Sequence, residues 1–340
     1  MPITLNQNIL KYKKILIVLS SALLVLATAL VFMFFTQKSI KDNDKDYKKA
    51  LKENYRIFAM PIPEKLDFCG EEVPINRFDV RESLDKELLT NTYWQSQTMM
   101  MIKRANRWFP VIEPILKKNN IPDDFKYLAL AESNFTLTVS PAGAAGFWQF
   151  MKETGTSFGL IINEEVDERY NLEKATDAAC KYLKDSYIST KSWTNAAASY
   201  NMGKGGVLKN MQTQKVSSYY DLLLNTETSR YVFRILSLKL ILQNPRDYGF
   251  YLRKLDMYPS IPTYTVPVDS SITDMVGFAK KYNLNYKLLK EFNPWLRKNI
   301  LTNKEKRIYN ITLPKEGNIF YDQLLKSVLV ETFILNDSVK

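Results

Sequence analysis

The sequence predicts a mainly α protein that begins with a transmembrane helix and ends with a small α+β module. Three features of the 340-residue chain support this fold class. Residues 15–35 carry no charge, and apolar side chains recur at helical spacing from about residue 80 to residue 250. After Pro259 the pattern changes to short strands and short helices.

The uncharged run at residues 15–35, ILIVLSSALLVLATALVFMFF, is close to the length of about 20 residues that a helix needs to cross a bilayer. Lys11, Lys13 and Lys14 precede the run and predict a cytoplasmic N-terminus at residues 1–14. A cleaved signal peptide is the alternative, but the apolar run continues past its possible cleavage site at Ala27–Ala29. We therefore expect a retained anchor, followed by a charged linker and N-terminal extension at residues 36–80.

The region from residue 81 to about residue 250 has mostly helical patterning, interrupted by a loop of small residues, SPAGAAG, at 140–146. Pro122, Asp123 and Asp124 predict a helix start, because proline suits the first helical position and carboxylates suit the positive end of the helix dipole. The predicted helices lie at residues 81–89, 98–118, 122–133, 147–155, 173–189, 192–206 (ended by glycines at 203, 205 and 206) and 227–244.

The composition excludes several kinds of catalysis. Histidine is absent, so serine–histidine and cysteine–histidine nucleophiles, HExxH zinc sites and histidine pH switches are ruled out. Cys69 and Cys180 are too few for a four-thiolate zinc site; in an exported chain they either form a disulfide or remain two thiols. Acid–base chemistry therefore falls to Glu, Asp, Tyr or Lys, and we expect no metal and no cofactor.

The net charge of +11 favours an anionic partner, such as a membrane surface or an acidic polymer. Nucleic acid is not an expected partner, because the N-terminal segment predicts export of the rest of the chain.

Glu132 is the candidate catalytic residue. Phe125, Leu128, Ala129 and Glu132 are spaced i, i+3, i+4 and i+7, so they share one otherwise apolar helix face. A carboxyl group on such a face loses hydration, which raises its pKa and suits a general acid that protonates a glycosidic oxygen. The alternative is a buried glutamate that is satisfied by a structural hydrogen bond.

Residues after Glu132 have the chemistry of a sugar site. The small-residue loop lets a ligand approach the backbone; Trp148 can stack on a sugar and Gln149 can hydrogen-bond a hydroxyl or acetamido group. Tyr200 and Asn201 lie at a predicted helix end beside glycines. Trp148 could instead be a core residue, and Tyr200 part of a helix C-cap.

The motif series AESNF, SPAGAAGFWQFM, AAASYNMG and ETSRYVFR resembles that of the lysozyme-like lytic transglycosylases. The family's Glu-Ser pair matches Glu132-Ser133, its Gly-Leu-Met-Gln segment matches GFWQ, and its Ala-Tyr-Asn segment matches SYN with serine in place of alanine. Its later glutamate falls at Glu227. FCGEEVP, Phe68 to Pro74, also resembles this branch, so the resemblance covers about residues 65–250.

The resemblance implies a goose-type, soluble-lytic-transglycosylase-like helical domain, which we place at residues 81–258. It implies a periplasmic enzyme of the cell inner membrane that cleaves the β-1,4 bond between N-acetylmuramic acid and N-acetylglucosamine in peptidoglycan. One glutamate acts first as acid and then as base, and the product ends are 1,6-anhydro sugars. Glu153, one turn beyond the GFWQ segment, is expected on a solvated face and not in catalysis.

The implied site residues have distinct roles. Glu132 is the acid and base, Ser133 orients it or the substrate, and Gln149 and Tyr200 bind sugar polar groups. Trp148 is expected to stack on a sugar, and Asn201 is expected to shape its loop. Glu227 has two possible roles. It positions groups around Tyr200, or it braces the last helix through Arg230 or Arg234.

Residues 259–316 have a β-α-α-β pattern that resembles a degenerate LysM domain, with a tail at 317–340. The Gly-Asp that usually follows the first strand is replaced by Asp269-Ser270-Ser271. The module either tethers the enzyme to glycan or is a structural appendage. Two other functions stay open from the sequence: a non-catalytic peptidoglycan-binding protein and a goose-type muramidase that hydrolyses with water.

Overall fold

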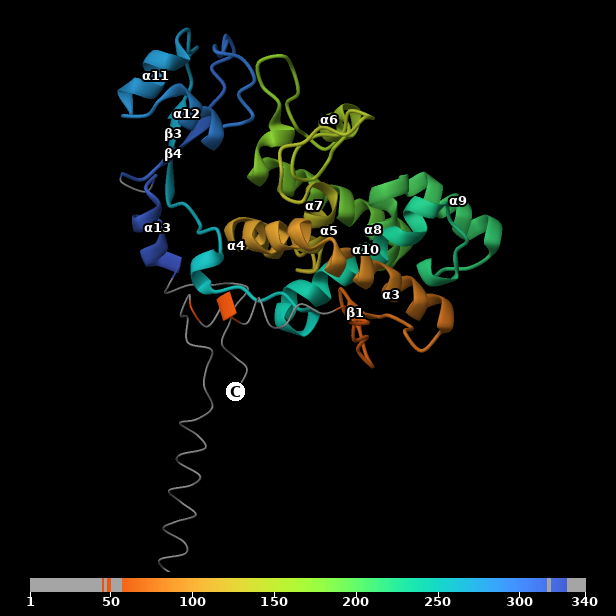
Figure 1. Ribbon diagram of the computed structural model, residues 1–340. Helices are drawn as coiled ribbons and strands as arrows, with labels where there is room; N and C mark the ends of the chain where they lie inside the picture. Colours follow the sequence, from red (N-terminus) through yellow and green to blue (C-terminus); the bar gives the residue numbers. More distant parts are fainter. Residues whose placement is uncertain (1–44, 46–47, 50–56, 317–318, 329–340) are drawn as a thin grey trace, which may run out of the picture. The chain divides into compact units, whose positions relative to one another are not determined.

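The computed structural model describes residues 45, 48–49, 57–316 and 319–328 (Figure 1). Residues 59–340 form one compact unit, and the account below concerns its described part. The predicted anchor at 15–35 and most of the tail lie outside the described residues. Within the described ranges, no helix combines the length and the apolar character that a bilayer crossing requires.

The described unit is mainly helical, as the sequence predicts, with two small two-stranded sheets. Its α-helices are α3 (Phe78–Tyr93), α4 (Gln95–Lys118), α5 (Phe125–Ser133), α6 (Lys152–Ser157), α7 (Leu172–Thr190), α8 (Trp193–Met202), α9 (Lys204–Gln214), α10 (Thr226–Gln243), α11 (Met275–Lys281), α12 (Tyr286–Phe292) and α13 (Tyr321–Val328). Its strands are β1 (Asp67–Phe68), β2 (Glu71–Glu72), β3 (Thr263–Val268) and β4 (Tyr309–Pro314), and its 3₁₀ turns are η1 (Glu168–Tyr170), η2 (Tyr219–Asp221), η3 (Pro245–Tyr248) and η4 (Lys254–Asp256).

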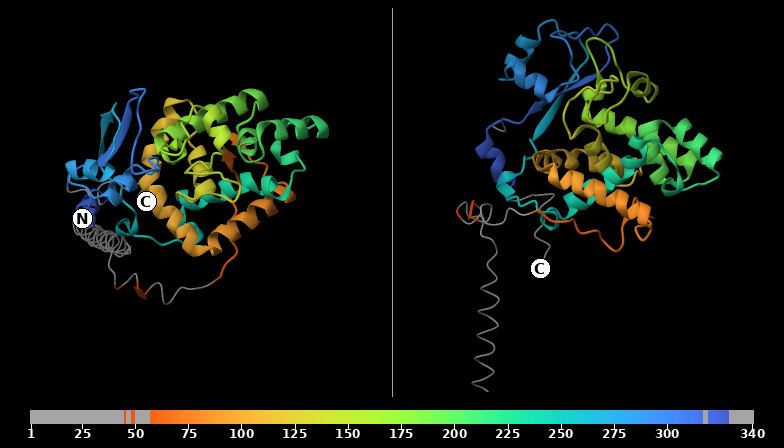
Figure 2. Two further views of the ribbon diagram at one scale, coloured as in Figure 1. Left: turned by 90° about the horizontal axis from the view of Figure 1, so that it is seen from above. Right: turned by 45° about the vertical axis from the view of Figure 1, so that its right-hand side comes forward.

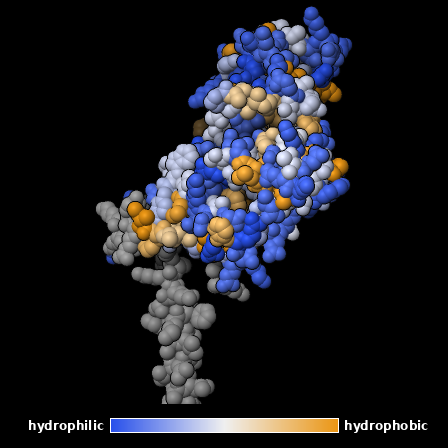
Figure 3. Space-filling model, turned by 90° about the vertical axis from the view of Figure 1, so that its right-hand side faces the viewer, coloured by the Kyte–Doolittle hydropathy of each residue, from blue (hydrophilic) through white to orange (hydrophobic). Residues whose placement is uncertain are grey.

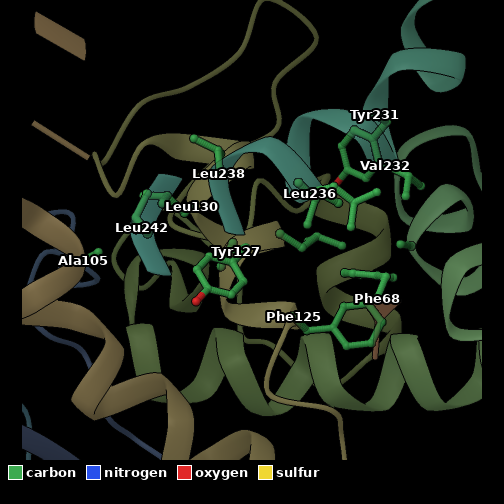
Figure 4. Packing of buried hydrophobic residues seen from close by; sticks show 14 of the residues in the cluster. Phe68, Ala105, Phe125, Tyr127, Leu130, Tyr231, Val232, Leu236, Leu238 and Leu242 are labelled. Carbon is green, nitrogen blue, oxygen red and sulfur yellow. The ribbon is translucent and has the colours of Figure 1, made fainter. Parts of the chain in front are cut away.

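Helix α10 is the central element of the core. Apolar side chains surround nearly its whole circumference, and a helix of that kind is stable only when other elements cover it. Helices α3, α5 and α8 pack against it. Figure 4 shows Tyr231 and Leu236 of α10 among the same buried side chains as Phe125 and Leu130 of α5. The surface is mostly hydrophilic on the face in Figure 3, with hydrophobic residues scattered across it.

The β1–β2 hairpin, which the sequence did not predict, fixes the start of two helices. Glu71 accepts hydrogen bonds from the backbone N–H groups of Trp193 (2.5 Å) and Thr194 (2.9 Å) at the beginning of α8, where a carboxylate suits the helix dipole. Just before α5, the Asp124 carboxylate accepts from the Cys69 N–H in the hairpin turn at 2.7 Å and from buried Lys239 at 2.8 Å. Cys69 in the hairpin turn and Cys180 in α7 are both free thiols, so no disulfide links them.

Several predicted helix boundaries differ from the structure, including both ends of α3 and the start of α4, and three further differences are informative. Helix α5 begins at Phe125, because Asp124 lies in a turn where its carboxylate accepts from Lys239 and from the Cys69 N–H. The predicted helix at 147–155 begins only at Lys152. The preceding Gln149 has φ +49°, a left-handed conformation that cannot belong to an α-helix. Gly203 ends α8 at φ +84°, but Gly205 and Gly206 lie inside the unpredicted α9.

The loop at residues 139–150 is held by backbone pairing and by one arginine. Ala145 pairs with both Val139 and Phe150 in isolated β-bridges. Arg169 donates from Nη1 to the carbonyl oxygens of Gly143 (2.9 Å) and Phe150 (3.1 Å). Arg169, which follows the loop in the chain, thus helps to set its position.

The C-terminal module has the predicted β-α-α-β order. Strands β3 and β4 pair antiparallel, with Thr263 opposite Pro314 and Val268 opposite Tyr309, and they lie side by side in both views of Figure 2. Helices α11 and α12 pack against each other, and α12 packs on β4. The module has a second hydrophobic core, which includes Leu289 and Ile311.

Gly146 lies where the loop at residues 139–150 approaches the backbone of Arg169. It has φ +80°, and a Cβ built on it would lie 1.8 Å from the Arg169 carbonyl oxygen. Gly143 has a similar φ of +89° but no atom within 4 Å of the same position. We expect Gly146→Ala to lower the free energy of unfolding by about 3 kcal/mol. Gly143→Ala should cost only about 1 kcal/mol, from backbone strain alone. Equal losses in urea denaturation would contradict this account of the loop.

Candidate active site

Glu132 lies in the last turn of α5, on the face that the sequence predicted to be apolar. Phe125, Leu128 and Ala129 on that face are fully buried, while the Glu132 side chain is half-buried. The hydroxyl of buried Tyr231, from α10, donates a hydrogen bond to Glu132 Oε1. The carboxyl group is thus held where the end of α5 meets the first half of α10.

Burial raises the pKa of Glu132 from its ordinary value to about 7, because the ionised form loses hydration. The Tyr231 hydrogen bond and the positive charge of Arg234 lower this pKa, and the negative charge of Glu227 raises it. Desolvation is the largest of these effects. A carboxyl group in this environment is partly protonated at neutral pH, so it can both give and accept a proton.

Ser133 is buried and positions the loop. Its Oγ donates to the Phe147 carbonyl oxygen at 2.8 Å and accepts from the Phe135 N–H at 3.1 Å. These hydrogen bonds are made to the backbone and not to Glu132, and the expected role of Ser133 in orienting Glu132 or the substrate stays a prediction. Ser133 connects the end of α5, next to Glu132, to the segment GFWQ.

Gln149 is half-buried and has a left-handed backbone conformation, φ +49°. Its Nε2 donates to the carbonyl oxygens of Gly146 (2.8 Å) and Thr138 (3.1 Å). The amide nitrogen is therefore used within the loop. The amide oxygen, Oε1, is the atom through which this side chain could accept a hydrogen bond from a sugar.

Trp148 is a core residue, and we do not retain it as a sugar-stacking residue. Its side chain is 0% exposed, so neither ring face is open to a ligand. The indole Nε1 donates to Thr176 Oγ1 at 2.9 Å, which satisfies its one polar group inside the core.

Tyr200 and Asn201 lie in the last turn of α8, and the structure brings Tyr200 to the GFWQ segment. The Tyr200 hydroxyl donates to the Trp148 carbonyl oxygen at 2.8 Å. Burial raises the pKa of Tyr200, and the negative charge of Glu132 adds to that rise. The Tyr200 side chain thus contacts the GFWQ segment, and its role toward a sugar stays a prediction.

Glu227 is exposed at the start of α10 and contacts Asn201. Asn201 Nδ2 donates to Glu227 Oε1 at 3.3 Å, and Asn201 Oδ1 accepts from Thr228 Oγ1 at 2.8 Å. Arg230 donates instead to Glu87. Of the two alternatives for Glu227, this arrangement favours positioning of the residues beside Tyr200. Glu153 is exposed, as expected.

Tyr231 is the site residue that the sequence analysis missed, although it lies inside the quoted motif ETSRYVFR. It follows Glu227 by four residues, so both side chains lie on one face of α10. That spacing could have drawn attention to it. Its contact with Glu132, 99 residues earlier in the chain, required the packing of α5 on α10.

The Tyr231 hydrogen bond gives a prediction for the ionisation of Glu132. Because the hydroxyl stabilises the carboxylate, Tyr231→Phe should raise the pKa of Glu132 above its value of about 7. The titration can be followed by carboxyl-carbon NMR of the selectively labelled protein. Tyr182→Phe, which removes a hydroxyl bonded to the Ser199 carbonyl oxygen, is the control and should leave that pKa unchanged. An unchanged or lower pKa in Tyr231→Phe would contradict the assignment.

Comparison with known proteins gives two family matches. Residues 109–223 match the family described as transglycosylase SLT domain, and residues 264–317 match the soluble lytic transglycosylase C-terminal LysM-like domain. The first match includes Glu132, Ser133, Gln149, Tyr200 and Asn201; Glu227 and Tyr231 lie beyond it.

Two curated relatives are membrane-bound lytic murein transglycosylase D from Escherichia coli strain K12 and from Escherichia coli O6:H1. Each is 29% identical to this chain over 235 residues, which is 66% of this chain and 50% of the relative. The chain therefore spans about half the length of the curated relatives it matches. The resemblance seen in the motifs is confirmed: this chain is similar to membrane-bound lytic murein transglycosylase D, with one region that matches the SLT domain and one that matches the LysM-like domain.

Proposed function

We propose that the protein is a lytic murein transglycosylase, a carbon–oxygen lyase that cleaves peptidoglycan between N-acetylmuramic acid and N-acetylglucosamine. The observation that carries the proposal is the Glu132 carboxyl group, desolvated in α5 and held by the Tyr231 hydroxyl within the region that matches the SLT domain. We assign the reaction to residues 81–258, with a goose-type lysozyme-like fold.

The proposed first step is proton transfer from Glu132 to the glycosidic oxygen. The bond from that oxygen to the anomeric carbon of the muramoyl residue breaks, and the N-acetylglucosamine side leaves as an alcohol. Positive charge develops on the anomeric carbon while Glu132 becomes a carboxylate. The hydrogen bond from Tyr231 and the positive charge of Arg234 both stabilise that carboxylate, since each lowers the pKa of Glu132.

In the second step the muramoyl 6-hydroxyl attacks the anomeric carbon of the same sugar, and Glu132 takes the hydroxyl proton. The new bond closes a 1,6-anhydro ring, and Glu132 returns to its protonated state. An attacking group on the same ring has a high effective concentration, so no second carboxylate is needed to activate water. Residues 139–150, which face this reaction in our assignment, contain no Asp or Glu.

The remaining site residues bind or position the sugar. We assign Gln149 Oε1 to a sugar hydroxyl or amide N–H and Tyr200 to polar groups near the cleaved bond. Ser133, Asn201 and Glu227 act through their contacts with the loop and with the end of α8. The role of Gln149 fits its hydrogen bonds, because both come from the amide nitrogen and leave the amide oxygen for a sugar.

The place of action is proposed to be the periplasmic side of the inner membrane. The relatives are named membrane-bound, and residues 15–35 have the length and composition of a single-pass anchor. The positive residues before that segment favour a cytoplasmic N-terminus, which would put Glu132 in the compartment that holds peptidoglycan.

Digestion of purified peptidoglycan sacculi by the full chain tests the reaction. Mass spectrometry should detect fragments with 1,6-anhydromuramoyl ends, and Glu132→Gln should lower the rate at least about 1,000-fold because the proposed proton donor is removed. Glu153→Gln, an exposed carboxyl in α6, is the matched control and should keep normal turnover. Reducing ends would indicate a muramidase, and the absence of products would indicate a binding protein; either would refute the proposal.

The pH dependence follows from the raised pKa. The first step needs protonated Glu132, so kcat/KM should fall as pH rises through about 7, with a limiting slope of about tenfold per pH unit. The profile can be measured on a soluble anhydro-free muropeptide oligomer. A rate that stays constant from pH 6 to pH 9 would show that this carboxyl group is not the acid.

A further inference from the structure

The C-terminal module is joined to the helical part by a short stretch of backbone pairing. Val166 and Leu296 form an antiparallel bridge. On either side, the Asp167 N–H donates to the Trp295 carbonyl oxygen at 2.9 Å, and the Arg297 N–H donates to the Glu165 carbonyl oxygen at 2.7 Å. A module that acted only as a flexible tether would not need this pairing.

Side chains reinforce the backbone pairing. The Glu165 carboxylate accepts from the Thr302 N–H at 2.6 Å and from Thr302 Oγ1 at 3.0 Å. The Arg297 guanidinium lies 4.1 Å from the centre of the Tyr170 ring, within cation–π distance. Val166 is 2% exposed and belongs to the hydrophobic core of the module. The contact between residues 165–170 and the module therefore combines a buried apolar side chain with polar interactions, as stable interfaces do.

The same stretch of chain supports the loop that carries Gln149. Asp167 pairs with Arg169 at 2.7 Å, and Arg169 donates to the Gly143 and Phe150 carbonyl oxygens. Gly146 lies directly against the Arg169 carbonyl oxygen. Ala145, at the middle of the loop, is part of the module's hydrophobic core. Contacts thus run without a break from the module to residues 143–150.

We propose that Glu165 and Arg297 are positioning residues, and that the C-terminal module acts as a brace for the active-site loop through residues 165–169. This inference rests on the proposed transglycosylase function and assigns the module a part in turnover itself. The loop is rich in small residues and has no helix of its own, so outside contacts determine where Gln149 lies. A displacement of about 1 Å in such a group is enough to lower turnover.

The test compares Glu165→Ala with Glu164→Ala in the full chain. Both variants remove one negative charge, but Glu164 is 89% exposed and makes only a long ion pair of 3.7 Å with Lys298. We expect Glu165→Ala to lower kcat about tenfold on both a short soluble muropeptide oligomer and intact sacculi, with KM changed less. Glu164→Ala should stay within about twofold of the parent, and Glu165→Gln, which keeps an acceptor for Thr302, should recover most of the rate.

Amide hydrogen exchange gives a readout that does not depend on activity. In Glu165→Ala, and more weakly in Thr302→Val, residues 143–150 should exchange faster while the exchange of α10 stays unchanged. Unchanged exchange at 143–150 would overturn the inference. A loss confined to sacculi would also overturn it, because that pattern belongs to a tether. If the parent cleaves neither substrate, the proposed function fails, and hydrogen exchange alone then decides whether the module braces the loop.

Discussion

Removal of one carboxyl group from water, with a hydroxyl group as its hydrogen-bond partner, is the constraint on which the site depends. Desolvation raises the pKa of Glu132, and the hydrogen bond from the Tyr231 hydroxyl limits that rise. The tyrosine does so without bringing a positive charge into contact with the carboxyl group. Both effects require the packing of α5 on α10. Because α10 is buried by several other helices, the core of the protein determines the acidity of the group at its edge.

The sequence predicted those parts of the site that depend on local periodicity. The apolar face of α5 and the place of Glu132 on it follow from a spacing of 3.6 residues, and the structure buries that face. Contacts between distant segments could not be predicted in this way. The Tyr231 hydroxyl reaches Glu132 across 99 residues, and the Glu71 carboxylate reaches the start of α8 across more than 120. Trp148 was ambiguous because a tryptophan suits both sugar stacking and core burial, and only its contact with Thr176 and its burial show which applies.

The module after Pro259 shows a different limit. Its strands and helices were predicted correctly because each has a short and distinctive pattern. Its pairing with residues 165–167 uses backbone N–H and carbonyl groups, which every residue except proline possesses, so no side-chain pattern predicts it. The position of a loop can therefore depend on residues outside it that its own sequence does not reveal; for residues 139–150 these include Ser133 and Arg169.

The desolvated Glu132 carboxyl group also makes the stability of the fold depend on pH. The pKa of Glu132 rises from 4.5 when unfolded to about 7 when folded, so the native chain holds this proton more tightly than the denatured chain does. The resulting contribution to stability is complete below pH 4.5 and is lost as pH climbs to about 7. Above a pH of about 7, Glu132 should therefore lose the proton that it donates, and the folded state should lose stability at the same time. A side chain that cannot ionise at this position should make the protein more stable but inactive. Selection for stability alone would therefore replace the residue that the proposed reaction requires.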